Sequence, residues 1–126
     1  MNSNSVVWFE IYVQDMTRAQ TFYESVLGSK LEPLGDPTDQ TVEMLSFPGD
    51  MEKYGANGAL VKMEGFSSGG NSSLIYFGCE DCADEGARVV SAGGRIEREK
   101  MSVGEYGCIV LAVDTEGNMF GLHSMK

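Results

Sequence analysis

The sequence predicts an α+β fold in which two βαβββ modules follow each other within one domain over residues 1–126. Three observations lead to this prediction. The length of 126 residues suits one domain. A strand-like run near the N-terminus is followed by a helical pattern, and the same order of elements returns 66 residues later. We therefore expect one module over about residues 6–64 and a second over about residues 72–126.

The first module begins with a strand and a helix. Residues 7–13 are rich in aromatic and β-branched side chains, which is typical of a strand. Asp15 is expected to cap the following helix, and Gly28 to end it. Between them, apolar residues recur at helical spacing: Met16, Ala19, Phe22, Tyr23 and Val26.

The second module repeats this order. A strand is predicted over residues 74–79, followed by a helix over residues 82–92. Asp81 is expected to cap this helix, as Asp15 caps the first, and Gly94 to stop it.

Three short strands complete each module, at residues 30–34, 41–47 and 59–63, and at residues 95–99, 108–113 and 119–124. A lone βαβββ sheet has one face covered by its helix and one face bare. The bare face is closed either by the twin module or by a second chain.

Composition limits the partners of this protein. Nine Lys and Arg residues against 19 Asp and Glu give a net charge of -10, which opposes contact with nucleic acid and with anionic membranes. No run of about 18 apolar residues is present, and the first residues lack the basic and apolar blocks of a signal peptide. Three cysteines are too few for a disulfide framework. We expect a reduced, cytoplasmic protein.

Three segments carry a resemblance to a known family. They are WFEIYVQDMTRA at residues 8–19, FYESVLG at 22–28 and VDTEGNMFGL at 113–122. With them the chain resembles the vicinal oxygen chelate (VOC) superfamily, which includes glyoxalase I, bleomycin-resistance and fosfomycin-resistance proteins and extradiol dioxygenases. The resemblance implies tandem βαβββ modules that form a cup-shaped, eight-stranded mixed sheet. It also implies a divalent metal in many members, and frequently a homodimer that exchanges modules.

The residues that the resemblance aligns with metal ligands do not suit a metal. Three of the four positions hold Trp8, Leu74 and Gly121, and the fourth falls at Lys62 or Glu64, where the strand register is open. A divalent ion needs three or more N, O or S ligands. We therefore expect neither a metal nor another cofactor.

The alternation of side chains along the first strand predicts which residues face the cup. One side, intended to pack under the helix, is wholly apolar: Val7, Phe9, Ile11 and Val13. The other side carries Trp8, Glu10 and Tyr12, which places a carboxylate between two aromatic rings.

The second module adds Tyr76, Gly121 and His123 to the same face by parity, and Gly121 would leave room for a ligand beside His123. In an alternative interpretation, Glu10 is solvated or bonded to Tyr76 or Lys62, and His123 is a surface residue. Were both Glu10 and His123 to face inward, they could act as general base and acid without a metal.

Cys79 and Cys82 have C-x-x-C spacing where a strand meets a helix, a place that favours a thiolate. Glu80 and Asp81 lie between them and oppose this charge. We expect these thiols to pack in the turn rather than to serve redox chemistry or zinc binding.

Three functions remain open at this point. The first is a small-molecule binding protein of the glyoxalase and bleomycin-resistance type, for a neutral or cationic ligand. The second is a lyase, isomerase or dioxygenase that is metal-dependent or uses Glu10 and His123, and the third is a module that works through protein contacts. The candidate ligand-binding residues are Trp8, Glu10, Tyr12, Lys62, Leu74, Tyr76, Gly121 and His123.

Overall fold

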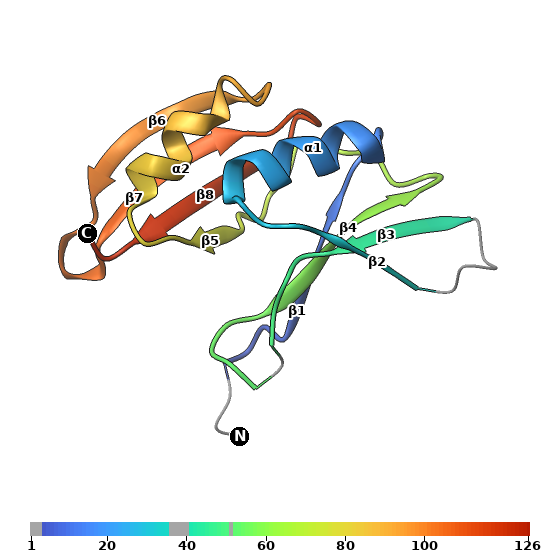
Figure 1. Ribbon diagram of the computed structural model, residues 1–126, viewed down its shortest axis with the longest axis horizontal. Helices are drawn as coiled ribbons and strands as arrows, with labels where there is room; N and C mark the ends of the chain where they lie inside the picture. The colour runs from blue at the N-terminus through green and yellow to red at the C-terminus, as the bar shows by residue number, and fades with distance from the viewer. Residues whose placement is uncertain (1–3, 36–40, 51) are drawn as a thin grey trace.

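The elements follow one another in the predicted order (Figure 1), in a computed structural model that describes residues 4–35, 41–50 and 52–126. The first module comprises β1 (Trp8–Tyr12), α1 (Met16–Leu27), β2 (Glu32–Leu34), β3 (Val42–Ser46) and β4 (Asn57–Met63). The second comprises β5 (Tyr76–Gly78), α2 (Cys82–Val89), β6 (Arg95–Ser102), a 3-10 turn (Gly104–Tyr106), β7 (Cys108–Val113) and β8 (Met119–Ser124).

Each module contributes one four-stranded mixed sheet. The strand order is β1-β4-β3-β2 in the first sheet and β5-β8-β7-β6 in the second. In both sheets the strand before the helix pairs in parallel with the last strand of the module, and the other pairs are antiparallel. The predicted tandem βαβββ fold is therefore confirmed, with its strands divided between two sheets.

The ends of α1 are those that the sequence predicts. The side chain of Asp15 accepts a hydrogen bond from the backbone N–H of Arg18 at 3.0 Å. Gly28 takes a left-handed conformation with φ 70°, which favours glycine. The predicted apolar stripe is buried throughout: Met16, Ala19, Phe22, Tyr23 and Val26.

The second helix is shorter than predicted. It ends at Val89 rather than at residue 92, and the left-handed residue of the following turn is Gly93, with φ 107°, not Gly94. Gly94 is needed for a different reason, because a Cβ there would lie 2.5 Å from the carbonyl oxygen of Val113.

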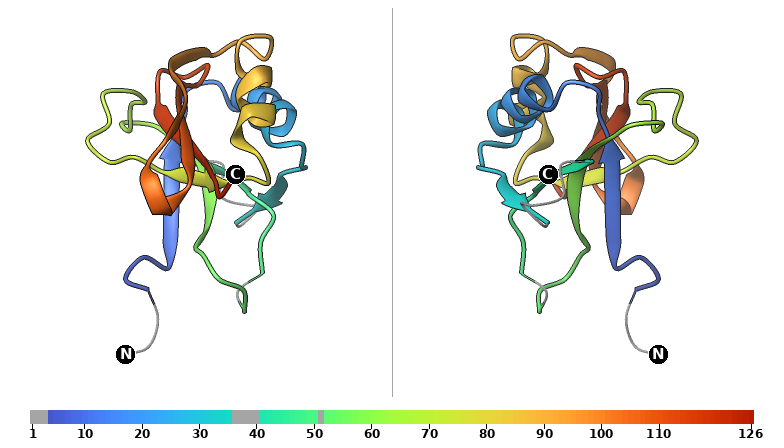
Figure 2. Two further views of the ribbon diagram at one scale, coloured as in Figure 1. Left: turned by 90° about the vertical axis from the view of Figure 1, so that its left-hand side faces the viewer. Right: turned by 90° about the vertical axis from the view of Figure 1, so that its right-hand side faces the viewer.

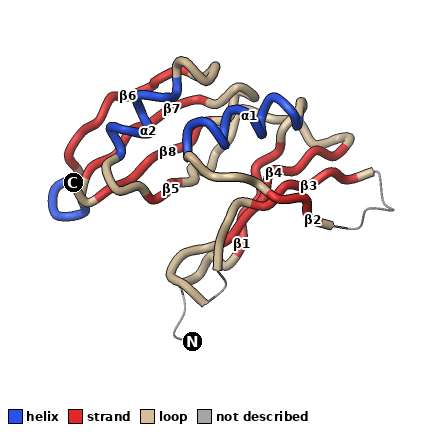
Figure 3. Tube along the Cα trace, viewed as in Figure 1, coloured by secondary structure: helices blue, strands red, loops and turns tan. Residues whose placement is uncertain are grey.

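The two modules pack with their helix-covered sides together. Phe9 of β1 lies 6.0 Å from Phe77 of β5 between ring centroids, and Phe47 lies 5.2 Å from Phe77. Tyr23 of α1 lies 5.5 Å from Phe120 of β8. Figure 2 shows α1 and α2 gathered on one side of the molecule, and Figure 3 shows both helices over the strands. The opposite face of each sheet, called the outer face below, carries neither helix.

One member of the predicted apolar side of β1 does not pack under the helix. Ile11 and Val13 are buried and Phe9 is packed against the core, but Val7 is 67% exposed. The prediction is wrong for Val7 because the strand begins one residue later, at Trp8.

A buried carboxylate joins the two modules. Glu116, in the turn between β7 and β8, accepts hydrogen bonds from the backbone N–H groups of Gln14 and Asp15, both at 2.9 Å. It also accepts one from Nε of Arg18 at 2.7 Å. Burial alone would raise the pKa of Glu116, but these hydrogen bonds outweigh it and lower the pKa to about 2.

The rest of this turn fastens further segments. Asn118 donates to the carbonyl oxygen of Tyr12 at 2.9 Å and accepts from the N–H of Gly69 at 2.7 Å. Asp114 accepts from the buried hydroxyl of Tyr23. The segment that carried part of the family resemblance therefore fixes one module against the other.

No helix in the described ranges of the chain is long and apolar enough to cross a membrane.

Candidate functional site

Glu10 lies between two aromatic side chains on the outer face of the first sheet. Its Oε2 accepts a hydrogen bond from the indole N–H of Trp8 at 3.2 Å, and its Oε1 accepts one from the hydroxyl of Tyr12 at 2.7 Å. The hydrogen bond from Tyr12 to Glu10, together with burial, raises the pKa of Tyr12. Phe66 stacks on Tyr12 with ring centroids 5.2 Å apart. The partners of Glu10 are thus its neighbours on β1, rather than Tyr76 or Lys62.

The pairing of β1 with β4 settles the strand register that the sequence left open. Glu10 lies opposite Ala59 and Tyr12 opposite Val61, so these four side chains share the outer face. Lys62 is the next residue along β4 and points to the other face. Glu64 lies beyond the end of β4.

The second sheet places Tyr76 and His123 on its own outer face. Tyr76 lies opposite Gly121, and a Cβ at Gly121 would lie 2.4 Å from the Tyr76 ring. The aromatic ring therefore fills the space in which we expected a ligand. His123 Nε2 contacts the carbonyl oxygen of Tyr106 at 2.5 Å, and Leu74 precedes β5.

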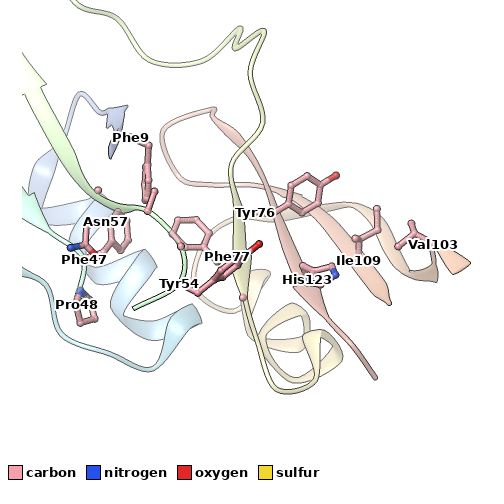
Figure 4. A pocket seen from close by; sticks show the side chains of 14 residues that line it. Phe9, Phe47, Pro48, Tyr54, Asn57, Tyr76, Phe77, Val103, Ile109 and His123 are labelled. Carbon is pink, nitrogen blue, oxygen red and sulfur yellow. The ribbon is translucent and has the colours of Figure 1, made fainter. Parts of the chain in front are cut away.

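A cavity of about 660 Å³ lies where the two modules meet (Figure 4). Tyr76 and His123 line it, as does Ile109 of β7. The first module supplies further walls from β1 and from the segment that leads into β4. The lining residues from both modules include Phe9, Phe47, Pro48, Tyr54, Asn57 and Phe77. The cavity is mostly apolar and suits a drug-sized molecule.

The cavity brings together only part of the predicted site. Of the eight predicted ligand-binding residues, Tyr76 and His123 line it. Within the described part of the chain, Trp8, Glu10 and Tyr12 do not line this cavity, so His123 and Glu10 are not joined there in one chain.

Sequence reasoning missed the aromatic walls of the cavity. Alternation along β1 assigned Phe9 to the packed side, and this side proves to extend into the cavity. Tyr54 belongs to the segment before β4, whose path no periodicity reveals. Phe9 and Phe77 lie inside strands and Phe47 directly follows β3, so no shared position along the elements marked these rings in the sequence.

The cysteines occupy packing positions. Cys82 is fully buried in the core, and Cys79 packs against it. Burial, with the nearby charge of Glu85, raises the pKa of the Cys79 thiol to about 12. A protonated thiol is a poor nucleophile and a poor ligand, which agrees with a role in packing.

The side chains at the metal positions of the family do not fit a divalent ion. The Trp8 indole only donates hydrogen bonds, and Leu74 and Gly121 offer no side-chain donor atom to a metal. Across the residues whose structure is described, no group of three or more His, Cys, Asp or Glu side chains is arranged to hold a metal ion.

The fold and the sequence define the class of protein. A family model for the Glyoxalase/Bleomycin resistance protein/Dioxygenase superfamily matches residues 5–122. The chain belongs to this superfamily. No curated protein matches the sequence.

Solved structures show the same fold. A glyoxalase I mutant from Zea mays superposes with a TM-score of 0.74 at 24% identity over 94% of this chain, which spans only 45% of the maize chain. The trypanothione-dependent glyoxalase I of Leishmania major gives 0.72 at 21% identity, over 98% of this chain and 88% of that one. TnmS3, an antibiotic binding protein from a Streptomyces species, gives 0.66 at 23% identity and covers 98% of both chains.

Proposed function

We propose that this protein binds a small, largely apolar or aromatic molecule in the cavity between its modules, without a divalent metal. The main support for this proposal is the size and the lining of the cavity. Its volume of about 660 Å³ lies within the range of ligand pockets, and its walls combine aromatic rings with a few polar groups such as His123 and Asn57. Antibiotic binding is the activity named for TnmS3, whose chain and this one each cover 98% of the other.

The charge of the protein narrows the ligand class. A net charge of -10 disfavours an anionic ligand, and aromatic walls suit a neutral or cationic one. The three unpaired cysteines fit a reducing compartment, and we place the protein in the cytoplasm.

We also propose that the protein is a homodimer. The outer faces of both sheets expose large apolar side chains, with Trp8 38% and Tyr76 46% accessible. A second copy packed against these outer faces would cover the exposed apolar side chains. It would also place the outer face that carries Trp8, Glu10 and Tyr12 against a sheet of the partner chain. In that arrangement Trp8, Glu10 and Tyr12 would contribute to a ligand site shared by two chains.

A ligand screen tests the main proposal. We expect compounds that raise the melting temperature of the protein equally with and without a chelator. Ile109→Trp would fill part of the cavity and should weaken binding of these compounds at least about tenfold. Val7→Trp, on an exposed residue away from the cavity, is the matched control. Binding that is unchanged by Ile109→Trp, or that requires a divalent ion, would overturn the proposal.

A further inference from the structure

A smaller pocket of about 250 Å³ adjoins the cavity and extends it toward the helices. The two share Phe47, Pro48, Phe77 and Gly78 as lining residues. The smaller pocket is also lined by Leu27 and Ser29 near the end of α1, and by Glu85 of α2. Phe47 and Phe77 therefore border both spaces, and Glu85 borders the smaller one.

Glu85 has a buried oxygen without a partner. Its Oε1 is buried and makes no hydrogen bond to any group in the described part of the protein. Its side chain is 17% exposed, and its Oε2 lies 3.9 Å from Nη2 of Arg88. Arg88 is directed elsewhere, because its Nε and Nη2 donate to the carbonyl oxygen of Val26 at 3.1 and 2.7 Å. Glu85 thus retains a free acceptor atom at the wall of a pocket.

The buried Oε1 of Glu85 would be stabilised by a hydrogen-bond donor. Buried polar atoms in folded proteins are nearly always hydrogen-bonded, and an orphaned carboxylate oxygen is destabilising. The nearby donor within the chain is the Cys79 thiol, which interacts with Glu85 but is only a weak donor, and which also donates to the carbonyl oxygen of Phe77 at 3.6 Å. A strong donor must come from outside the described chain.

We propose that Glu85 is a specificity-determining residue that receives a protonated amine of the ligand at its Oε1. The ligand class is an aryl-alkyl amine: an aromatic body in the large cavity, an alkyl stem beside Phe47 and Phe77, and an ammonium group at Glu85. A charge-assisted hydrogen bond of this kind is stronger than a neutral one, and the two rings favour a nearby cation. The inference rests on the proposed function, since it presumes that the ligand occupies the cavity.

A matched pair of probes tests it. Phenylbutylamine and phenylbutanol differ only in the group that would meet Glu85, and calorimetry at neutral pH measures the affinity of each. We expect the amine to bind the wild-type protein about tenfold more tightly than the alcohol. Glu85→Gln should remove this preference by weakening the binding of phenylbutylamine about tenfold and that of phenylbutanol much less, because the neutral amide oxygen still accepts a hydrogen bond from the hydroxyl. Glu80→Gln removes the same charge from a side chain that is 93% exposed, and it should keep the preference.

A second variant guards against a folding artefact. Glu85→Asp keeps the charge but draws the carboxylate back by one methylene, so it should reduce the preference for the amine only in part. An equal preference in the wild-type protein and in Glu85→Gln would overturn the inference while leaving the proposed function standing. Failure of phenylbutylamine to bind would also overturn it, whereas the proposed function is decided separately by the Ile109→Trp screen.

Discussion

Arg18 on α1 and Glu116 in the β7–β8 turn form an ion pair between residues 98 positions apart, with Arg18 Nε 2.7 Å from Glu116 Oε2. The Glu116 side chain is fully buried, whereas that of Arg18 is 53% exposed. Glu116 also accepts hydrogen bonds from the backbone N–H groups of Gln14 and Asp15, which lie between β1 and α1. The contact therefore fixes the turn through which the chain passes from β1 to α1. The position of this turn sets where Phe9 and the other residues of β1 lie relative to the second module.

Glu116→Gln should destabilise the protein by about 2–3 kcal/mol near neutral pH, since it weakens hydrogen bonds to a buried charge. The pKa of Glu116 is lowered from its ordinary value of 4.5 to about 2, so its contribution is complete above about pH 4.5 and disappears as the pH falls toward 2. Urea unfolding of both proteins between these pH values measures the difference, which should shrink on acidification. The exposed Glu105→Gln is the control. A difference that stays constant with pH would contradict the assignment.

Tyr23→Phe should cost about 2 kcal/mol of unfolding free energy. The Tyr23 ring is fully buried and its hydroxyl donates to Asp114, a carboxylate that would lose a partner without gaining water. Tyr54→Phe removes a hydroxyl from a residue that is 95% exposed and should leave stability unchanged. Equal denaturation midpoints for the two variants would show that the hydroxyl of Tyr23 contributes nothing.

Gly94→Ala should destabilise the protein by about 3 kcal/mol. The added Cβ would meet the backbone oxygen of Val113 at 2.5 Å and the ring of Phe22 at 2.7 Å, and a backbone atom cannot move aside cheaply. Gly78→Ala is the matched change, since nothing lies within 4 Å of its added Cβ. Thermal unfolding distinguishes the two, and a stable Gly94→Ala protein would refute the close approach.

The thiols should resist oxidation. With a pKa raised to about 12, Cys79 is ionised in only about one molecule in ten thousand at pH 8. Titration of the denatured protein should still find three thiols after mild peroxide treatment of the folded protein. A loss of two thiols that dithiothreitol restores would indicate a disulfide and a redox role after all.

Light scattering after gel filtration should give the mass of two chains. Trp8→Lys replaces an exposed apolar side chain of the outer face with a positively charged one beside Glu10. It should shift the protein toward the monomer, because a charged side chain would be buried in the interface. Val90→Lys, on an exposed residue of the helix side, should not. A wild-type protein that is monomeric at all concentrations would contradict the proposed dimer.

The local elements of this protein could be predicted from its sequence. The stripe on α1, its cap at Asp15 and its end at Gly28 depend on neighbours within one or two turns, and all three were confirmed. The end of α2 was placed too late because Gly93 and Gly94 are adjacent, and local pattern does not show which of them turns the chain.

The sequence by itself determined two modules of known order, an acidic surface and the residue types available for binding. Only the tertiary structure decided that the helix-covered sides meet, that the Tyr76 ring covers Gly121, and that Glu85 reaches a pocket beside Phe47 and Phe77. The physical reason is that the periodicity of side chains along a helix or strand shows only which residues share a face of that one element. The meeting of two faces depends instead on contacts such as Arg18 with Glu116, which join residues far apart in the chain.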